Sequence, residues 1–372
     1  MSHVRQPSGE VADAPHTPWV RSLRTSIIAT LAVCIVLLAF AWPTVTSSPE
    51  HLPVAAVGSP EQITAMKEKL PENLLDMHDA TDRDDAVHQI ETREVYGAIV
   101  LGEQPEILVA GAASPVAAQM LTQAGNSMQR AIDQQVIESM SQGIEKMQQA
   151  MAQGSRPGTG AAPSVPDGSQ ARQEAPPSVK ITDVVPLSES DPRGSGLAIA
   201  GLPLAMGGMI GGSLISLLVS GTWRRLTAIA AYGVMGGLAL TLILQPWLDI
   251  LAGNFWANAG ATGLGLVATA ALIVGLNSVM GRAGIAIGAI ITVFIGNPLS
   301  GLTQPKEFIV QPWGEIGQWL VPGLSGTVLR DLSYFPHADL TWQILALAAW
   351  VVFGSILIMV GHYRNQGAVG RG

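Results

Sequence analysis

The chain has 372 residues, of which 48% are hydrophobic and only 13% are charged, and its formal net charge is −8. The acidic balance excludes an electrostatic binder of nucleic acid, and a single cysteine excludes intrachain disulfides and cysteine-based metal sites. Charge is scarcest from residue 194 onward, where only 7 Lys/Arg and 5 Asp/Glu occur, so this half of the chain is predicted to be embedded in a membrane.

The first apolar stretch, residues 25–42, carries no charge. At ~1.5 Å per residue it forms a helix of roughly 27 Å, which is about the thickness of a bilayer's hydrocarbon core. Three arginines precede it, so the tail 1–24 is expected to be cytoplasmic. We favour a retained membrane anchor; the alternative is a cleavable signal peptide cut after Ala39-Phe40-Ala41.

Residues 43–153 are predicted to form an extracytoplasmic α/β domain, because short apolar runs alternate with helix-forming stretches. A Gly-containing turn joins its last two apolar runs, which indicates a hairpin. The expected strands are 52–58, 73–78, 95–101 and 106–110, and the expected helices are 59–70, 82–94 and 114–153.

The helix predicted over 114–153 is long and rich in Met and Gln. Its apolar positions repeat with nearly the period of a straight α-helix. Two interpretations stay open for this stripe: packing on the sheet or on a second copy of the chain, and an adaptable binding face.

Residues 154–195 are rich in Pro, Gly and Ser and are predicted to be a flexible linker. Beyond the linker, loops rich in arginine alternate with loops that have few or no Lys/Arg, as the positive-inside rule requires for six spans with both termini in the cytoplasm. Residues 363–372 are then the second cytoplasmic tail. The fold class expected is therefore an α-helical membrane protein of six transmembrane helices, with the α/β domain inserted between helices 1 and 2. The later five spans, within a bundle over 196–362, are 196–220, 226–243, 260–280, 284–299 and 342–361.

No catalytic motif is found: the sequence lacks a P-loop, an HExxH and a GxSxG pattern. The cores of the predicted spans contain no Asp, Glu, Lys or Arg, whereas pumps and intramembrane proteases need titratable groups at depth. We therefore expect no enzyme, no cofactor and no resident metal, and a bilayer as the main partner.

One candidate packing seam consists of glycines in overlapping GxxxG patterns, which permit close approach of a second helix. These residues are Gly207, Gly208, Gly211 and Gly212. They fit ordinary packing within the bundle or the seam of a homodimer. The outer loop 303–340 is too apolar for a free loop, and it is predicted to lie on the bundle as a lid or to handle lipid at the interface.

Four stretches resemble the type-2 ABC transporter permease family, in its phage-infection-protein branch. They are LPVAAVG after the first span, DRDDAVHQIETREVYGAIVLG at 82–102, ILVAGAASPVAAQML at 107–121, and GNPLSG with QPWGEIGQWLVPG within 296–323. The resemblance covers most of 25–362 and implies a permease subunit that exports a hydrophobic or surface-destined substrate. It implies, further, a homodimer energised by a separate ATP-binding subunit in a bacterial plasma membrane.

In that interpretation the ATPase contact lies on a short cytoplasmic loop, at Trp223, Arg224 and Arg225. The alternative function is a membrane-anchored scaffold or receptor, whose extracytoplasmic domain recruits a cell-envelope or secretion partner.

Overall fold

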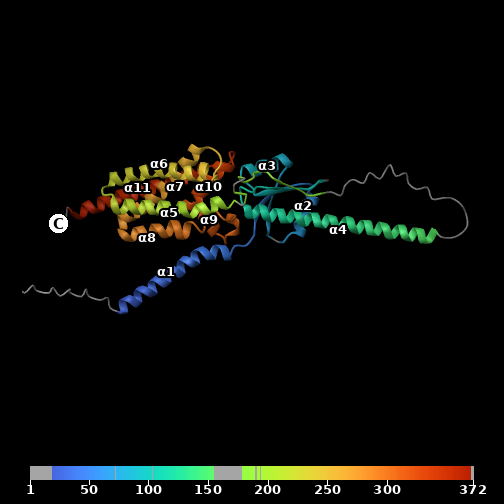
Figure 1. Ribbon diagram of the computed structural model, residues 1–372, viewed down its shortest axis with the longest axis horizontal. Helices are drawn as coiled ribbons and strands as arrows, with labels where there is room; N and C mark the ends of the chain where they lie inside the picture. The colour runs from blue at the N-terminus through green and yellow to red at the C-terminus, as the bar shows by residue number, and fades with distance from the viewer. Residues whose placement is uncertain are drawn as a thin grey trace, which may run out of the picture.

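The computed structural model describes residues 19–71, 73–102, 104–154, 178–188, 191–192 and 194–369. Most of the predicted tail 1–24, most of the linker 154–195 and the last residues of the tail 363–372 lie outside the described residues. Figure 1 shows a helical bundle and a small sheet domain set end to end, with one long helix projecting from the sheet domain away from the bundle.

Within the part of the chain that the structure describes, the sheet domain has five strands in the spatial order β2-β1-β3-β4-β5. Strands β3 and β4 form the expected antiparallel hairpin, and the other neighbouring pairs are parallel. The elements are β1 (Leu52–Val57), α2 (Pro60–Lys69), β2 (Leu75–Asp79), α3 (Arg83–Glu91), β3 (Gly97–Val100), β4 (Glu106–Val109), α4 (Pro115–Gly154) and β5 (Lys180–Asp183).

Strand β5 corrects the predicted linker, because it lies within 154–195 and completes the sheet beside β4. Its pairing aligns Ile181 with Ile107. The Pro-, Gly- and Ser-rich composition of the whole stretch predicts no strand, but the residues from Val179 to Val185 are mostly β-branched and favour one. The chain thus returns to the sheet before it enters the bundle.

Two helices of the sheet domain begin at side-chain caps that the sequence encodes. Ser59 and Gln62 form a capping box in front of α2, with Pro60 in its first turn. The Asp82 carboxylate accepts a hydrogen bond from the backbone N–H of Asp85 at the start of α3. Because these caps satisfy otherwise unpaired N–H groups, both helices start where the sequence predicts.

The bundle consists of long apolar helices. They are α1 (Trp19–Val45), α5 (Ser195–Leu218), α6 (Thr222–Leu242) with its π-helical extension η1 (Ile243–Trp247), α7 (Phe255–Met280), α8 (Arg282–Ala289) with its extension η2 (Ile290–Gly296), and α11 (Thr341–Val369). Three short helices, η3 (Lys306–Phe308), α9 (Trp313–Trp319) and α10 (Val321–Tyr334), connect η2 to α11.

Among the described residues, five helices are long and apolar enough to cross a membrane: Ser26–Val45, Ser195–Leu218, Thr222–Trp247, Phe255–Met280 and Thr341–Arg364. The chain is thus built as a multi-pass membrane protein. The sixth span, predicted at 284–299, corresponds to the shorter apolar helix Arg282–Gly296. The count of six spans stays a prediction.

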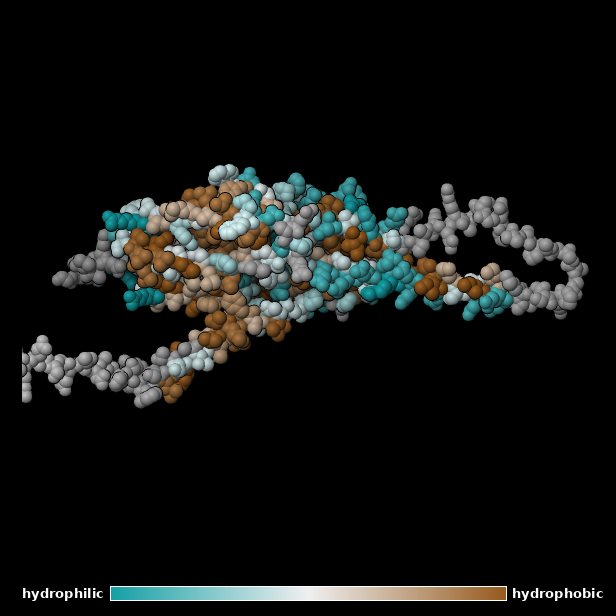
Figure 2. All heavy atoms as spheres, viewed as in Figure 1, coloured by the Kyte–Doolittle hydropathy of each residue, from teal (hydrophilic) through white to brown (hydrophobic). Residues whose placement is uncertain are grey.

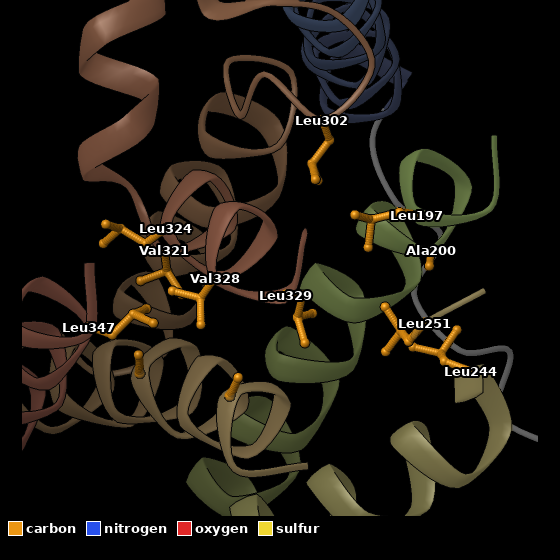
Figure 3. Packing of buried hydrophobic residues seen from close by; sticks show 12 residues of the cluster. Leu197, Ala200, Leu244, Leu251, Leu302, Val321, Leu324, Val328, Leu329 and Leu347 are labelled. Atoms are coloured by element: carbon orange, nitrogen blue, oxygen red, sulfur yellow. The ribbon is translucent and has the colours of Figure 1, made fainter. Parts of the chain in front are cut away.

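Helix α7 is the centre of the bundle and packs against α5, α6, α8, α10 and α11. Its small residues allow close approach: a β-carbon on Gly275 would collide with the backbone of Gly354 in α11. Toward the sheet domain, Leu197, Leu251, Val328 and Leu329 join a cluster of buried apolar side chains between α5, α7 and α10 (Figure 3).

On the face that Figure 2 shows, the surface of the bundle is mostly hydrophobic, whereas that of the sheet domain is largely hydrophilic. Helix α1 diverges from the bundle, and its exposed residues include Ile28 and Leu31. Its C-terminal end is attached through two edge-on ring contacts: the ring centroids of Phe40 and Phe294 lie 6.3 Å apart, and those of Trp42 and Trp313 lie 6.2 Å apart. Such faces are stable when lipid covers them.

Candidate functional site

The segment between η2 and α11, residues 297–340, anchors the sheet domain to the bundle. Phe335, at the end of α10, is buried with Ala55, Ile90 and Leu108 on the face of the sheet that α3 covers. Phe308, in η3, is buried with residues on the other face, which α4 covers. The outer loop predicted over 303–340 therefore contributes to the core of the sheet domain as well as covering the bundle.

An ion pair crosses the same junction. The Arg93 guanidinium, from the turn after α3, donates a hydrogen bond to the Asp331 carboxylate on α10; the Asp331 side chain is buried, and the Arg93 side chain is 16% exposed. The guanidinium also lies over the ring of Phe335, 5.4 Å from its centroid. Removing either partner would leave an uncompensated buried charge, so this contact fixes how the domain sits on the bundle.

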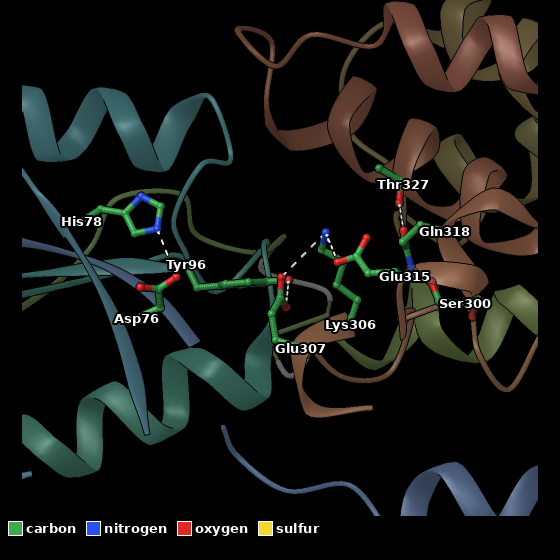
Figure 4. Close-up of polar contacts among 9 residues, drawn as sticks. All are labelled: Asp76, His78, Tyr96, Ser300, Lys306, Glu307, Glu315, Gln318 and Thr327. Carbon is green, nitrogen blue, oxygen red and sulfur yellow. Dashed lines mark hydrogen bonds and ion pairs between the residues drawn. The ribbon is translucent and has the colours of Figure 1, made fainter. Parts of the chain in front are cut away.

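A second polar contact lies beside the first. The Tyr96 hydroxyl, at the entry to β3, donates to the Glu307 carboxylate at 3.1 Å. Next to it, Lys306 pairs with Glu315 of α9 at 2.9 Å, and Gln318 links Ser300 to Thr327 (Figure 4). Helix α9, η3 and the sheet domain are thus connected by polar side chains at the level where the apolar helices end.

These groups line a cavity of about 650 Å³ between the sheet domain and the adjacent end of the bundle. This volume falls within the range of small-molecule sites. The charged residues in its lining are Arg93, Lys306 and Arg330, and Glu94, Glu307, Glu315, Asp331 and Asp339. The lining also contains Trp319 and Trp342, whose rings lie 5.3 Å apart.

Arg330 is the unusual member of this lining. It is 8% exposed and donates to the carbonyl oxygen of Leu302 at 2.9 Å. No ion pair holds its guanidinium among the described residues, although a guanidinium has five N–H donors. Burial, together with the nearby Arg93 charge, lowers the pKa of Arg330 to about 10. A buried cation with unused donors in a cavity wall indicates a binding function.

Gln343, in the first turn of α11, is a second under-used group in the lining. The residue is 7% exposed, and its Oε1 accepts no hydrogen bond from the described residues. Leaving a buried amide oxygen unpaired is costly. The terminal torsion of a Gln side chain is soft, so its amide can turn toward a ligand.

Burial changes the acid–base properties of the junction. It raises the pKa of the Glu307 carboxyl, against the effect of Lys306 and Tyr96, and it raises the pKa of the Tyr96 hydroxyl. Burial also raises the pKa of Asp331, while Arg93 acts in the opposite direction. The cavity can therefore offer both hydrogen-bond donors and acceptors from groups held in place by protein contacts.

The residues predicted to contact an ATPase lie at the opposite end of the bundle. Trp223 is 74% exposed and Arg224 is also exposed. Arg225 is engaged within the chain, because its guanidinium donates to the carbonyl oxygens of Val219 and Ser216 and to Ser278 Oγ at 3.0 Å. Of the three, only Trp223 and Arg224 present free surface to a partner.

The glycine seam of α5 faces neighbouring helices of the same chain. A β-carbon on Gly208 would lie 2.6 Å from Thr269 Cβ, and one on Gly212 would lie 2.9 Å from Ala270 Cα, both in α7. On the α6 side, Tyr232 donates to the carbonyl oxygen of Gly207 at 2.6 Å and covers Gly211. The structure therefore places all four glycines against α6 and α7.

Sequence patterns alone did not identify the junction residues. Arg93 and Asp331 are 238 positions apart, so no local spacing could connect them. One signal was present: Arg330 and Asp331 are adjacent charges inside a stretch that is otherwise apolar. Such charges are costly next to a membrane unless they are paired or bind something.

Comparisons of this chain with protein-family models, with curated proteins and with solved structures found no match.

Proposed function

We propose that this chain is a permease-like subunit of an ABC-type exporter in a bacterial plasma membrane, with a hydrophobic or surface-destined substrate and a separate ATPase. The sequence supplies no P-loop of its own. The observation that carries the proposal is the asymmetry of the bundle: arginines lie at one end, and the sheet domain is attached to the other.

Arginines gather at the end far from the sheet domain. Arg225, near the start of α6, donates to Ser278 near the end of α7, and Arg364 of α11 donates to the carbonyl oxygen of Val279. The sheet domain is attached at the other end, where Arg93 of that domain donates to the Asp331 carboxylate of α10. By the positive-inside rule, the arginine end is cytoplasmic and the sheet domain is outside.

The arginine end is where a cytoplasmic ATPase would bind. Trp223 and Arg224 are exposed there and suit the enrichment of Trp and Arg in interface cores. At the sheet end, Trp256 is 72% exposed and serves as a matched control. A photo-crosslinking amino acid at position 223 is expected to capture an ATP-binding protein in native membranes, whereas one at 256 is not.

Capture of an ATP-binding protein at neither position, or equally at both, would contradict the exporter proposal.

The orientation is tested separately by cysteine labelling. Cys34 is replaced by Ser, and single cysteines are placed at Met147, on exposed α4, and at Arg224. A membrane-impermeant maleimide applied to intact cells should label position 147 and not position 224.

One observation favours the second function, a scaffold or receptor. Beyond the sheet, α4 exposes an apolar stripe whose side chains are 50–66% exposed: Ile137, Met140, Ile144 and Met147. Replacing all four with Ser or Gln leaves the bundle untouched. Two results would favour recruitment through α4 over export. In the first, this variant loses function while cross-linking at position 223 is unchanged. In the second, the variant loses function and the parent shows no cross-linking at position 223.

A further inference from the structure

We propose that the junction cavity binds a neutral polyhydroxylated group, such as the sugar head group of a membrane lipid. The inference rests on the proposed function only in treating this ligand as the cargo; binding itself requires no ATPase. Three features of the lining carry it: the charge balance, the unused hydrogen-bonding groups and the position of two tryptophans.

The charge balance disfavours an anionic ligand. Five carboxylates and three basic side chains line the cavity, a formal excess of two negative charges. Lys306 is paired with Glu315, and Arg93 with Asp331, so only Arg330 remains as a buried cation without an ion pair among the described residues. A phosphate entering the cavity would be repelled by the excess of carboxylates in its lining.

The unused groups require a ligand that both accepts and donates. Arg330 donates to Leu302 and has further N–H groups for an acceptor. Gln343 Oε1 needs a donor. A hydroxyl group meets both needs, because it donates one hydrogen bond and accepts others. Several adjacent hydroxyls on one ring would satisfy both residues with a single neutral ligand.

The two tryptophans place the ligand at the level of the bilayer surface. Trp342 lies in the first turn of the apolar helix α11, and Trp319 closes α9 beside it; they are 41% and 62% exposed. Interfacial tryptophans occupy this depth, and the apolar face of a sugar ring packs well on an indole. Below Trp342, Leu345 is 64% exposed along α11, where an acyl chain can lie.

The test uses three probes that separate the head group from the chain. The full-length protein is purified in a detergent without sugar, and native mass spectrometry measures binding of dodecyl maltoside, maltose and dodecylphosphocholine. One dodecyl maltoside per chain is expected to bind at least 10-fold more tightly than dodecylphosphocholine. Maltose binding within a few-fold of the maltoside indicates a free sugar as the natural ligand, and much weaker maltose binding indicates a glycolipid.

Two variants address the site and one serves as control. Gln343→Leu and Trp319→Ala should each weaken maltoside binding about 10-fold, whereas Trp256→Ala, at the same end of the bundle, should not. Thermal unfolding without ligand shows that each variant is folded. Equal binding of dodecylphosphocholine, or binding that both site variants leave unchanged, would overturn the proposal. Either result would leave the cross-linking test of the exporter proposal unaffected.

Discussion

Phe308 and Phe335 belong to one connecting segment, yet their side chains are buried on opposite faces of the same sheet. The bundle therefore holds the sheet domain from both sides. A flexible tether would not need such contacts, because apolar burial on both faces opposes rotation of the domain. The junction cavity is lined by Glu307, next to Phe308, and by Asp331, one turn before Phe335, so its shape depends on both anchors.

The two phenylalanines should be among the most important residues for keeping the sheet domain in place. Phe335 is 1% exposed and Phe308 is 6% exposed, and truncating a buried Phe to Ala costs about 3–5 kcal/mol. We expect Phe335→Ala and Phe308→Ala each to increase hydrogen–deuterium exchange in peptides covering β1 and β3. Phe353→Ala on α11, where the ring is 48% exposed, is the control. Unchanged exchange in both junction variants would show that the anchors contribute little.

The ion pair between Arg93 and Asp331 should show strong coupling. Breaking a buried pair costs about 3–5 kcal/mol, whereas replacing both partners with apolar residues is often nearly neutral. Arg93→Met and Asp331→Leu should each lower the thermal unfolding temperature of the full-length protein. The double variant should recover much of the loss, and Arg130→Met, on exposed α4, should have no effect.

Additive losses in the double variant would mean that the two charges act independently. That outcome would contradict the pairing described above and assign Arg93 mainly to its contact with Phe335.

Local signals predicted most of the sheet domain, because caps and short apolar runs are properties of neighbouring residues. Strands β1, β3 and β4 and helices α2, α3 and α4 lie within a few residues of the predicted ranges. Strand β5 was missed because Pro, Gly and Ser dominate the stretch around it. The apolar helices were predicted from hydropathy alone. The helix Arg282–Gly296 begins and ends two to three residues before the predicted range 284–299, and its C-terminal part is π-helical.

The candidate site could not be predicted in the same way. The residues around the cavity come from β1, the loop between α3 and β3, η3, α9, α10 and α11. Their contacts span more than 200 positions, such as Tyr96 with Glu307. A single sequence encodes such pairs only through the complete fold. Composition can suggest where to search, because adjacent charges at Arg330 and Asp331 are unexpected beside apolar helices.

The close contact of α6 with α7 should tolerate no side chain at its centre. A β-carbon on Gly237 would lie 2.9 Å from both the Cα and the N of Gly263, which are backbone atoms that cannot rotate away. Gly237→Ala should therefore lower resistance to SDS-induced unfolding. Gly260→Ala is the matched control, because nothing lies within 4 Å of its added carbon, and alanine favours a helix by up to about 1 kcal/mol. Equal behaviour of the two variants would argue against close packing here.

Acid should loosen the edge of the sheet that contains β5. The Glu106 carboxylate receives hydrogen bonds from Arg83 at 2.7 Å and from Thr182 at 2.6 Å, and it pairs with Lys180 at 3.0 Å. The Arg83 hydrogen bond, supported by Thr182 and Lys180, lowers the pKa of Glu106 from 4.5 to about 2.

Because the folded pKa lies below the unfolded pKa, the folded state favours the ionised carboxylate. The stabilisation is fully present above pH 4.5 and disappears as the pH falls toward about 2. Its size is about 2 kcal/mol after allowance for the partly exposed Arg83.

We therefore expect exchange in peptides covering β4 and β5 to rise between pH 4.5 and 2 in the parent protein. Glu106→Gln should show fast exchange at neutral pH and little further change on acidification. The comparison peptide covers β2, at the other edge of the sheet and away from Glu106. A parent protein whose β5 exchange does not depend on pH, once corrected for the intrinsic rate, would show that the Glu106 contacts do not hold this strand.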